Sequence, residues 1–291
     1  MPEKVKVPAI RFKGFTDAWE QRKLHDIADV RDGTHDSPKY ISQGHPFITS
    51  KNVGGGYINY DAVQYISDSD FVEINKRSKV DKNDILMGMI GTIGNIALIR
   101  ENPDFAIKNV ALIKDTKVVN YLYLYHYLQS SNVMKQLSSG MDGGTQKFIA
   151  LNKIRNLNIL LPNDDEQQVV GQFLENLDNL ITLHQRKLLK LKNIKKAMLE
   201  KMFPKNGNNV PEIRFAGFTD AWEQRRFDMM FERISNNSLS RANLNYKTGN
   251  IKSIHYGDIL IKYGAIIDCR KDEIPFITRG AISDYEHQLL R

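Results

Sequence analysis

The sequence predicts an α+β protein in which a β-rich domain is followed by one long helix and then by a second, incomplete unit. Three observations predict this order: a duplicated segment, a strand-like stretch after its first copy and a sustained heptad pattern. The nine residues GFTDAWEQR occur at 14–22 and again at 217–225, and the similarity extends over 8–24 and 211–227. A spacing of this length is far too long for a solenoid repeat, so it indicates two domain-sized units.

The first unit, residues 8–163, is expected to contain mostly short strands. Its segments are rich in Ile, Val, Tyr and Phe and are separated by Gly, Asn, Asp and Pro, which is typical of strands and hairpins. One helix is predicted over Val119 to Leu137, while Asp68 and Asp70 are interpreted as cap or loop residues. Gly88, Gly91 and Gly94 do not follow the G-x-G-x-x-G spacing, so they predict hairpin turns. The predicted strand segments are YIS, PFITSKNV, GYINY, AVQYIS, DILMGMIGTIGNIALI and NVALIK.

A single helix is predicted over residues 164–204, with Asp164 or Asp165 as its cap and Pro204 at its end. Apolar side chains recur there at alternating steps of four and three, which favours a coiled-coil spacer that pairs with a second helix over a core helix. His184 and Lys195 interrupt this seam. The predicted helix-pairing seam consists of Val170, Leu174, Leu177, Ile181, Leu188, Leu191, Met198 and Met202.

A polar linker, residues 205–210, leads to the second unit at 211–291. This unit is much shorter than the first and contains a predicted hairpin, HYGDILIKYG, at 255–264. Its sheet is expected to be unfinished, and unpaired strand edges favour disorder or association.

Composition and charge limit the function. The 291 residues are 41% hydrophobic, enough for one or two sizeable cores. No signal-peptide pattern opens the chain, and its longest uncharged run, 85–99, is too short to span a membrane, so a cytoplasmic protein without a membrane role is expected. A single cysteine, Cys269, excludes an intramolecular disulfide and a multi-cysteine zinc site, and the seven histidines are scattered, so no metal site is expected.

No motif in the sequence predicts catalysis. No glycine loop leads to a Walker A lysine, no G-x-S-x-G elbow occurs, and no cysteine and histidine are placed as nucleophile and base. The net charge of +7 and the pI of about 9.2 favour a polyanionic partner, although many basic proteins bind no nucleic acid. A binding protein is therefore expected rather than an enzyme.

Six motifs follow one another along the chain: GFTDAWEQRKL, DGTHDSPKY, DILMGMIGTIGNIALI, GGTQKFIALNKIRNLNILLP, EQQVVGQFLENLDNLI and the second GFTDAWEQRRF. In this order they resemble the specificity subunits of type I restriction and modification systems. The resemblance implies a target-recognition domain at 8–163 that reads half of a bipartite DNA site, a spacer and dimerisation helix at 164–204, and an incomplete second target-recognition domain at 211–291. Unlike the family pattern, the second unit has no long helix of its own.

The resemblance also implies partners and cofactors. The subunit itself would be non-catalytic and bind double-stranded DNA, methyltransferase subunits and restriction subunits. Those partners would use S-adenosylmethionine, ATP and Mg²⁺, and the complex would be a DNA adenine methyltransferase and ATP-dependent endonuclease. Two alternatives stay open: a non-functional or half-subunit fragment that acts only as a coiled-coil assembly module, and a homodimer formed through the long helix.

Candidate DNA contacts are polar side chains near the predicted loops. Asn and Gln suit adenine edges, whereas Lys suits guanine or phosphate. The candidates are Thr34, His35, Lys39, Lys51, Asn52, Lys108, Asn109, Gln146 and Lys147.

Overall fold

The computed structural model describes residues 7–139, 148–233, 235–236, 239–259, 261–264 and 266–288. The chain divides into two compact units, one ending at Lys192 and the other beginning at Asn193. The long helix α6 (Asp164–Lys201) passes through this boundary. No described helix combines the length and apolar character needed to cross a membrane.

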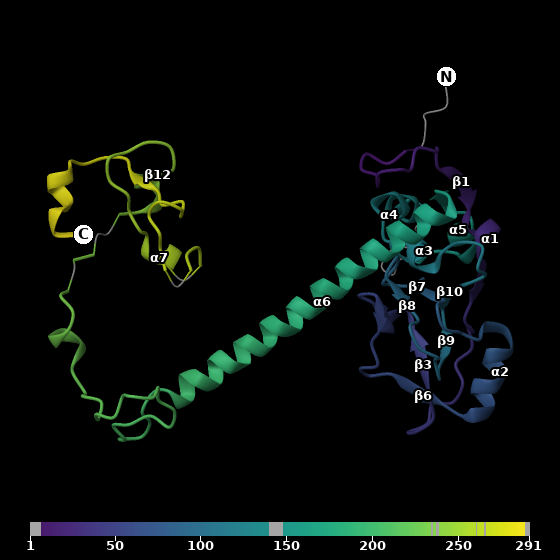
Figure 1. The fold of residues 1–291 in the computed structure, drawn as a ribbon, viewed down its shortest axis with the longest axis horizontal. Helices are drawn as coiled ribbons and strands as arrows, with labels where there is room; N and C mark the ends of the chain where they lie inside the picture. Colours follow the sequence, from purple (N-terminus) through teal and green to yellow (C-terminus); the bar gives the residue numbers. More distant parts are fainter. Residues whose placement is uncertain are drawn as a thin grey trace. The chain divides into compact units, whose positions relative to one another are not determined.

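The first unit is built on two sheets (Figure 1). The four-stranded sheet has the order β2-β10-β7-β8, and every neighbouring pair is antiparallel. The three-stranded sheet has the order β6-β3-β9, in which β3 and β9 are parallel. The strands are β2 (Asp29–Asp32), β3 (His45–Thr49), β6 (Gln64–Ile66), β7 (Ile85–Gly88), β8 (Ile96–Leu98), β9 (Ala106–Lys108) and β10 (Val110–Lys114). The antiparallel β7–β8 pair confirms the predicted hairpin.

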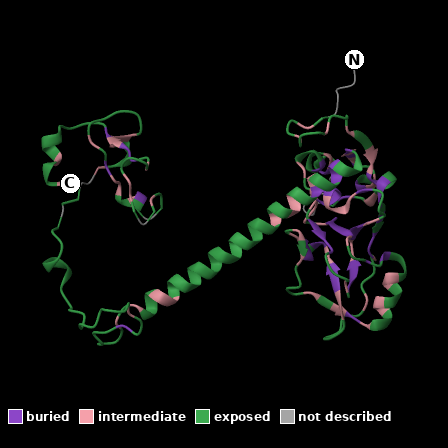
Figure 2. Ribbon diagram, viewed as in Figure 1, coloured by how far each residue is buried: buried purple, intermediate pink, exposed green. Residues whose placement is uncertain are grey.

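Strands β7, β8 and β10 of the four-stranded sheet consist almost entirely of buried residues (Figure 2), whereas β2 alternates exposed and buried residues. Along β10, Val110 and Leu112 belong to one hydrophobic cluster, and Ala111 and Ile113 belong to another. Successive side chains of a strand point to opposite faces, so a strand covered on both sides is apolar throughout. This explains why the sequences of β7, β8 and β10 show no polar alternation.

Two short antiparallel pairs complete the strands of this unit. Strand β1 (Glu20–Lys23) pairs with β11 (Asn158–Leu161), and β4 (Val53–Gly54) pairs with β5 (Tyr57–Ile58). The first pair joins the end of the duplicated segment to the last strand before α6. The sequence alone did not predict β1.

The helices of the first unit correct two predictions. Asp68 and Asp70 are not loop residues: they form the first turn of α2, where the Ser67 side chain accepts a hydrogen bond from the Asp70 backbone N–H at 3.2 Å. The predicted helix over 119–137 is two helices, because Ser130 starts a new one. The helices before α6 are α1 (Leu24–Ile27), α2 (Asp68–Ser78), α3 (Tyr121–Leu128), α4 (Ser131–Ser138) and α5 (Leu151–Arg155).

The start of α6 is built into the first unit. Asn163, not Asp164 or Asp165, caps it, because its side-chain oxygen accepts a hydrogen bond from the Glu166 backbone N–H at 2.9 Å. Gly171 lies against α3 so closely that a Cβ there would be 2.7 Å from the Tyr123 backbone nitrogen. A glycine inside this helix is therefore required by packing, despite its low helix propensity.

In the second unit, the residues that the structure describes form only short elements besides the end of α6. Strand β12 (Leu244–Asn245) pairs with β13 (Phe276–Ile277). The predicted hairpin at 255–264 is wrong: its described residues contain the short helix α7 (Tyr256–Ile259) and no strand. Short 3-10 helices occur at η1 (Ser50–Asn52) in the first unit and in the second unit at η2 (Phe227–Met229), η3 (Arg241–Asn243) and η4 (Ile282–Gln288).

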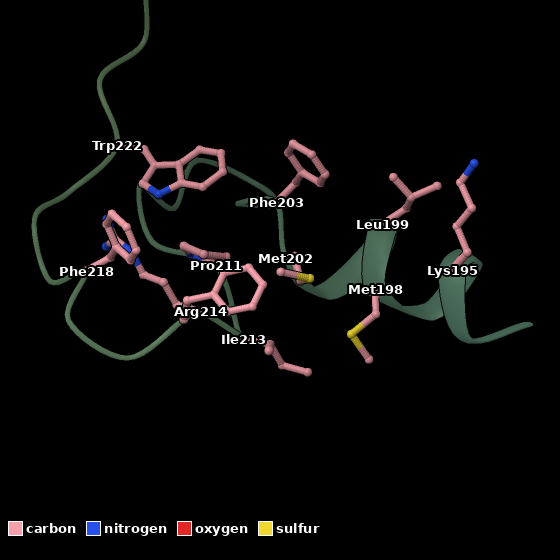
Figure 3. Close-up of a pocket in the computed structure, with 11 residues that line it drawn as sticks. Lys195, Met198, Leu199, Met202, Phe203, Pro211, Ile213, Arg214, Phe218 and Trp222 are labelled. Atoms are coloured by element: carbon pink, nitrogen blue, oxygen red, sulfur yellow. The ribbon is translucent and has the colours of Figure 1, made fainter. Parts of the chain in front are cut away.

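An apolar cavity of about 430 Å³ lies within the second unit, between the last turns of α6 and the second copy of the repeat (Figure 3). Met198 and Met202 of the predicted seam line it from the helix, and Trp222 lines it from the repeat. The Trp222 ring stacks edge-on against Phe203, with 5.8 Å between ring centroids. Two seam residues are therefore covered from within their own unit.

Candidate nucleic-acid interface

The two sheets of the first unit meet at the end of β2. The Gly33 N–H donates to the Val110 carbonyl at 3.0 Å, and the Thr34 N–H donates to the Ile107 carbonyl at 3.1 Å. A Cβ on Gly33 would lie 2.4 Å from the Ile107 carbonyl oxygen, so only glycine allows this approach. Asn109 completes the contact in the left-handed region, at a φ of 52°. The loop at 33–40 is thus fastened to the turn between β9 and β10.

A network of polar side chains lies at this junction. The two ring nitrogens of His35 face Asn109 Oδ1 at 2.6 Å and Asp32 Oδ2 at 3.0 Å. Arg77, at the end of α2, donates to the other oxygen of the buried Asp32 carboxylate. Asp32 therefore orients one aromatic and one cationic side chain at the same edge. We call Asp32, Thr34, His35, Arg77, Lys108 and Asn109 the junction cluster.

Two further loops are attached to the junction cluster through Ser50. The Ser50 hydroxyl donates to the Asn109 carbonyl at 2.7 Å and accepts the backbone N–H groups of Met89 and Ile90 at 3.0 and 3.3 Å. The side chain of Lys108 donates to Ser37 in the neighbouring loop. The loops after β2, β3, β7 and β9 thus form one connected edge.

The predicted DNA contacts differ in their position and burial in the structure. Thr34, His35, Lys108 and Asn109 are brought together in the junction cluster, and Lys39 and Lys51 are exposed on its loops. Asn52 is only 8% exposed. Its amide oxygen accepts from the Thr49 backbone N–H at 3.0 Å, and its amide nitrogen donates to the Asn59 carbonyl at 3.0 Å, so no group of Asn52 is free to read a base. Gln146 and Lys147 lie outside the described residues.

Sequence reasoning missed Arg77, whose side chain is 65% exposed while it is held by Asp32. A guanidinium offers a planar fork of donors that suits phosphate and guanine. The available signal was the basic pair Lys76 and Arg77 at the C-terminal turn of α2, but that helix was not predicted. Arg77 was therefore not predicted because the helix that carries it, α2, was not predicted.

The middle of α6 exposes the predicted seam. The side chains of Leu177, Ile181, Leu188 and Leu191 are between 40 and 54% exposed, and Val170 packs partly on the first unit's core. A second exposed apolar row lies one residue before the seam positions and before the two residues that interrupt the seam, and it consists of Val169, Phe173, Leu180, Leu183 and Ile194. The apolar face is therefore wider than the narrow seam of a two-stranded coiled coil.

Comparison with known proteins identifies the family. Residues 16–193 match the family model described as the type I restriction modification DNA specificity domain. The chain is 23% identical over 189 residues to the type I restriction enzyme MjaVIII specificity subunit of Methanocaldococcus jannaschii, covering 62% of this chain and 44% of that protein. It is 26% identical over 169 residues to the EcoBI specificity subunit of Escherichia coli, covering 56% of this chain and 35% of that protein.

Solved structures of similar proteins include the S subunit of a type I restriction-modification system from M. genitalium, with a TM-score of 0.44 and 17% identity, covering 66% of this chain and 47% of that one. The HsdS subunit from Thermoanaerobacter tengcongensis has a TM-score of 0.41 and 17% identity, covering 67% and 46%. The chain spans less than half the length of the curated relatives given above. Because the family model matches more than half of it, the chain belongs to the type I restriction modification DNA specificity domain family.

Proposed function

We propose that this chain is a DNA-recognition subunit whose first unit reads one half of a bipartite site in double-stranded DNA. The observation that carries this proposal is the junction cluster, which gathers Arg77, Lys108 and His35 on an edge made by four connected loops. Sequence is read by side chains that reach base edges, and such side chains need a rigid support to keep their position. The positive net charge of the chain favours the same partner.

The chemistry would belong to partner subunits. Methyltransferase and restriction subunits would supply the S-adenosylmethionine, ATP and Mg²⁺ chemistry, and this chain would be non-catalytic. The purified chain alone is then expected neither to methylate nor to cut DNA, and adding its methyltransferase partner is expected to create adenine methylation. Turnover of S-adenosylmethionine by the chain alone would contradict this assignment.

The exposed face of α6 supports a second part of the proposal, that the helix pairs with another helix. Two chains that pair their helices around a twofold axis would present two identical readers in opposite orientation. Protein symmetry of this kind is mirrored in the symmetry of the DNA site. The dimer would therefore recognise an interrupted palindrome whose gap is set by the length of α6.

Sequencing methylated adenines tests both parts in cells that carry this chain and its methyltransferase as their only system. A gapped palindrome supports the dimer. An asymmetric motif means that residues 211–291 also read DNA, and the absence of any motif favours the alternative of a non-functional fragment or assembly module.

The junction cluster and the loops attached to it can be tested by two variants and a control. Replacing Arg77 or Lys51 with Ala is expected to weaken DNA binding and to reduce the dependence on salt by about one phosphate contact if the side chain meets the backbone. Lys79→Ala is the control, because the Lys79 ammonium pairs with Asp81 and not with a residue of the junction cluster. Equal DNA affinity for Arg77→Ala, Lys51→Ala and the unaltered chain would exclude this edge as the interface.

A further inference from the structure

Helix α3 and helix α6 bring three potential metal ligands together inside the first unit. His126 Nε2 lies 3.8 Å from Glu175 Oε2, and His126 Nδ1 lies 3.9 Å from Asp178 Oδ2. One ligand atom of each residue lies within 4.8 Å of the others. Glu175 and Asp178 are three positions apart on α6, which places them on one face of the helix toward α3.

The histidine of this group is unusual. Its side chain is only 7% exposed, and its buried Nε2 atom has no hydrogen-bond partner among the described residues. Buried polar atoms are normally hydrogen-bonded, because an unsatisfied one loses its hydration without gaining a partner. We therefore expect either a metal ion that binds the lone pair of Nε2 or a hydrogen-bond acceptor that receives its N–H. Glu175 and Asp178 are the nearest carboxylates, but neither is within hydrogen-bonding distance.

We propose that His126, Glu175 and Asp178 bind one divalent transition-metal ion that fastens α6 to α3. One imidazole and two carboxylates form a ligand set that Zn²⁺ accepts, with water completing a tetrahedron. Ligand atoms around a tetrahedral zinc lie roughly 3.3 Å apart, by the geometry of zinc–oxygen and zinc–nitrogen bonds of about 2 Å. Glu175 faces Nε2 of the imidazole and Asp178 faces Nδ1, so binding one ion through a single ring nitrogen requires side-chain rotations that bring ligand atoms now within 4.8 Å of one another to this spacing.

The charges around the group are compatible with a cation. Arg100 Nη2 donates to both oxygens of Glu175, at 3.0 and 2.9 Å, and its guanidinium lies 5.8 Å from the centre of the Tyr125 ring. A ligating carboxylate is commonly held by a second hydrogen-bonding partner of this kind. Burial outweighs the two carboxylates and lowers the pKa of His126 below its ordinary value, which favours the neutral ring that metals require.

Metal binding would fix the direction of α6 relative to α3. Gly171 already holds the second turn of α6 against α3, and the ion would add a second fixed point one to two turns further along. Two fixed points define the direction in which the helix leaves the first unit. Since the helix sets the distance between readers in the proposed complex, a fixed direction would make that distance reproducible.

Calorimetric titration of the chelator-treated full chain with ZnCl₂ tests the site without DNA or partner subunits. We expect one saturable ion per chain and a rise in Tm on adding Zn²⁺. Asp178→Asn and His126→Gln should weaken binding by more than about tenfold, since even the loss of an outer partner costs ten- to a hundredfold. Titration with Co²⁺ should give visible absorption bands that both variants lose.

Two substitutions on the same helix serve as matched controls. His184→Gln and Glu200→Gln change an exposed histidine and an exposed carboxylate outside the group, and both should leave Zn²⁺ affinity unchanged. Asp178→Asn keeps the test valid if His126→Gln fails to fold, because Asp178 is half exposed. Absence of saturable binding, or equal weakening in the controls and in Asp178→Asn, would overturn the proposal.

Discussion

The two copies of GFTDAWEQR have one sequence and two structures. In the first copy, the residues from Glu20 onward form β1, which pairs with β11; in the second copy, residues 217–225 contain no strand. The turns do repeat, since Gly14 and Gly217 both adopt positive φ, at 104° and 91°. A turn depends on local residues, whereas a strand depends on a partner. Within this segment, the turn therefore forms from its own residues, whereas the strand forms only where a partner strand is present.

The side-chain contacts of the two copies differ in the same way. Arg11 makes a two-pronged ion pair with the buried Glu166 at the start of α6, with distances of 2.7 and 2.6 Å. The equivalent Arg214 has a buried Nη1 atom without a hydrogen-bond partner among the described residues. Phe12 packs edge-on against Phe173, whereas the equivalent Phe215 is 70% exposed. The first copy therefore packs against the start of α6, whereas the second copy lines the apolar cavity together with the last turns of α6.

The largest expected effect comes from the tryptophan that the copies share. Trp19 packs against the first unit's core and edge-on against Tyr123, so Trp19→Ala should destabilise that unit by about 3 kcal/mol, the lower end for a tryptophan because Trp19 is only partly buried. Trp222→Ala lies in the second unit and should change the stability of the first unit by less than about 0.5 kcal/mol. Hydrogen exchange of the β7 and β10 amides measures both. Equal losses would remove the distinction between the copies.

Gly171→Ala should have the next largest effect, because it disturbs the helix start that receives the first copy. The added methyl group would meet the backbone of Tyr123 and overpack the α3–α6 contact, at a cost of about 1–3 kcal/mol. Gln172→Ala, at the neighbouring exposed position, is the control and should be neutral or slightly stabilising. Thermal unfolding followed by circular dichroism compares the two, and an unchanged Tm for Gly171→Ala would show that the helices separate readily.

A smaller effect is expected for the arginine pair. Arg11→Met leaves Glu166 without its guanidinium, although the positive end of α6 still favours a carboxylate in its first turn, so we expect a modest decrease in Tm. Arg214→Met removes an arginine with an unsatisfied nitrogen and should not lower Tm. If Arg214→Met is the more damaging variant, the second copy makes an ion pair that is as important as the first.

The smallest expected effect is that of deleting every residue after Asn209. Because the first unit ends at Lys192 as a compact body, its unfolding temperature and its hydrogen-exchange protection should not change. Cell-based methylation by the truncated chain would sharpen the comparison further, since the same motif as for the full chain would show that the second copy reads no DNA.

Segments with a distinctive composition or a long repeat could be predicted from the sequence, and polar or locally determined elements could not. The strands around Ile85 and Val110 were predicted because their segments are rich in apolar, strand-favouring residues and are bounded by turn residues, whereas the helix from Asp164 was predicted because apolar residues repeat along it. Helix α2 was missed because its mostly polar sequence shows little apolar periodicity, and the break at Ser130 was missed because a cap is a single local hydrogen bond. Of the candidate site, the loops were predicted, but Arg77 was not.

The sequence by itself determined the order of the parts, the length of the long helix and the family, because each depends on residue types at fixed spacings. Only the tertiary structure decided what each residue contacts. It buried Asn52 and joined His35 to Asp32 and Asn109 across the sheets. It also placed His126 beside two carboxylates about fifty positions away and gave one copy of a nine-residue segment a strand that the other lacks. The physical reason is that burial and hydrogen bonding are relations between distant segments, so identical residues acquire different structures when different partners reach them.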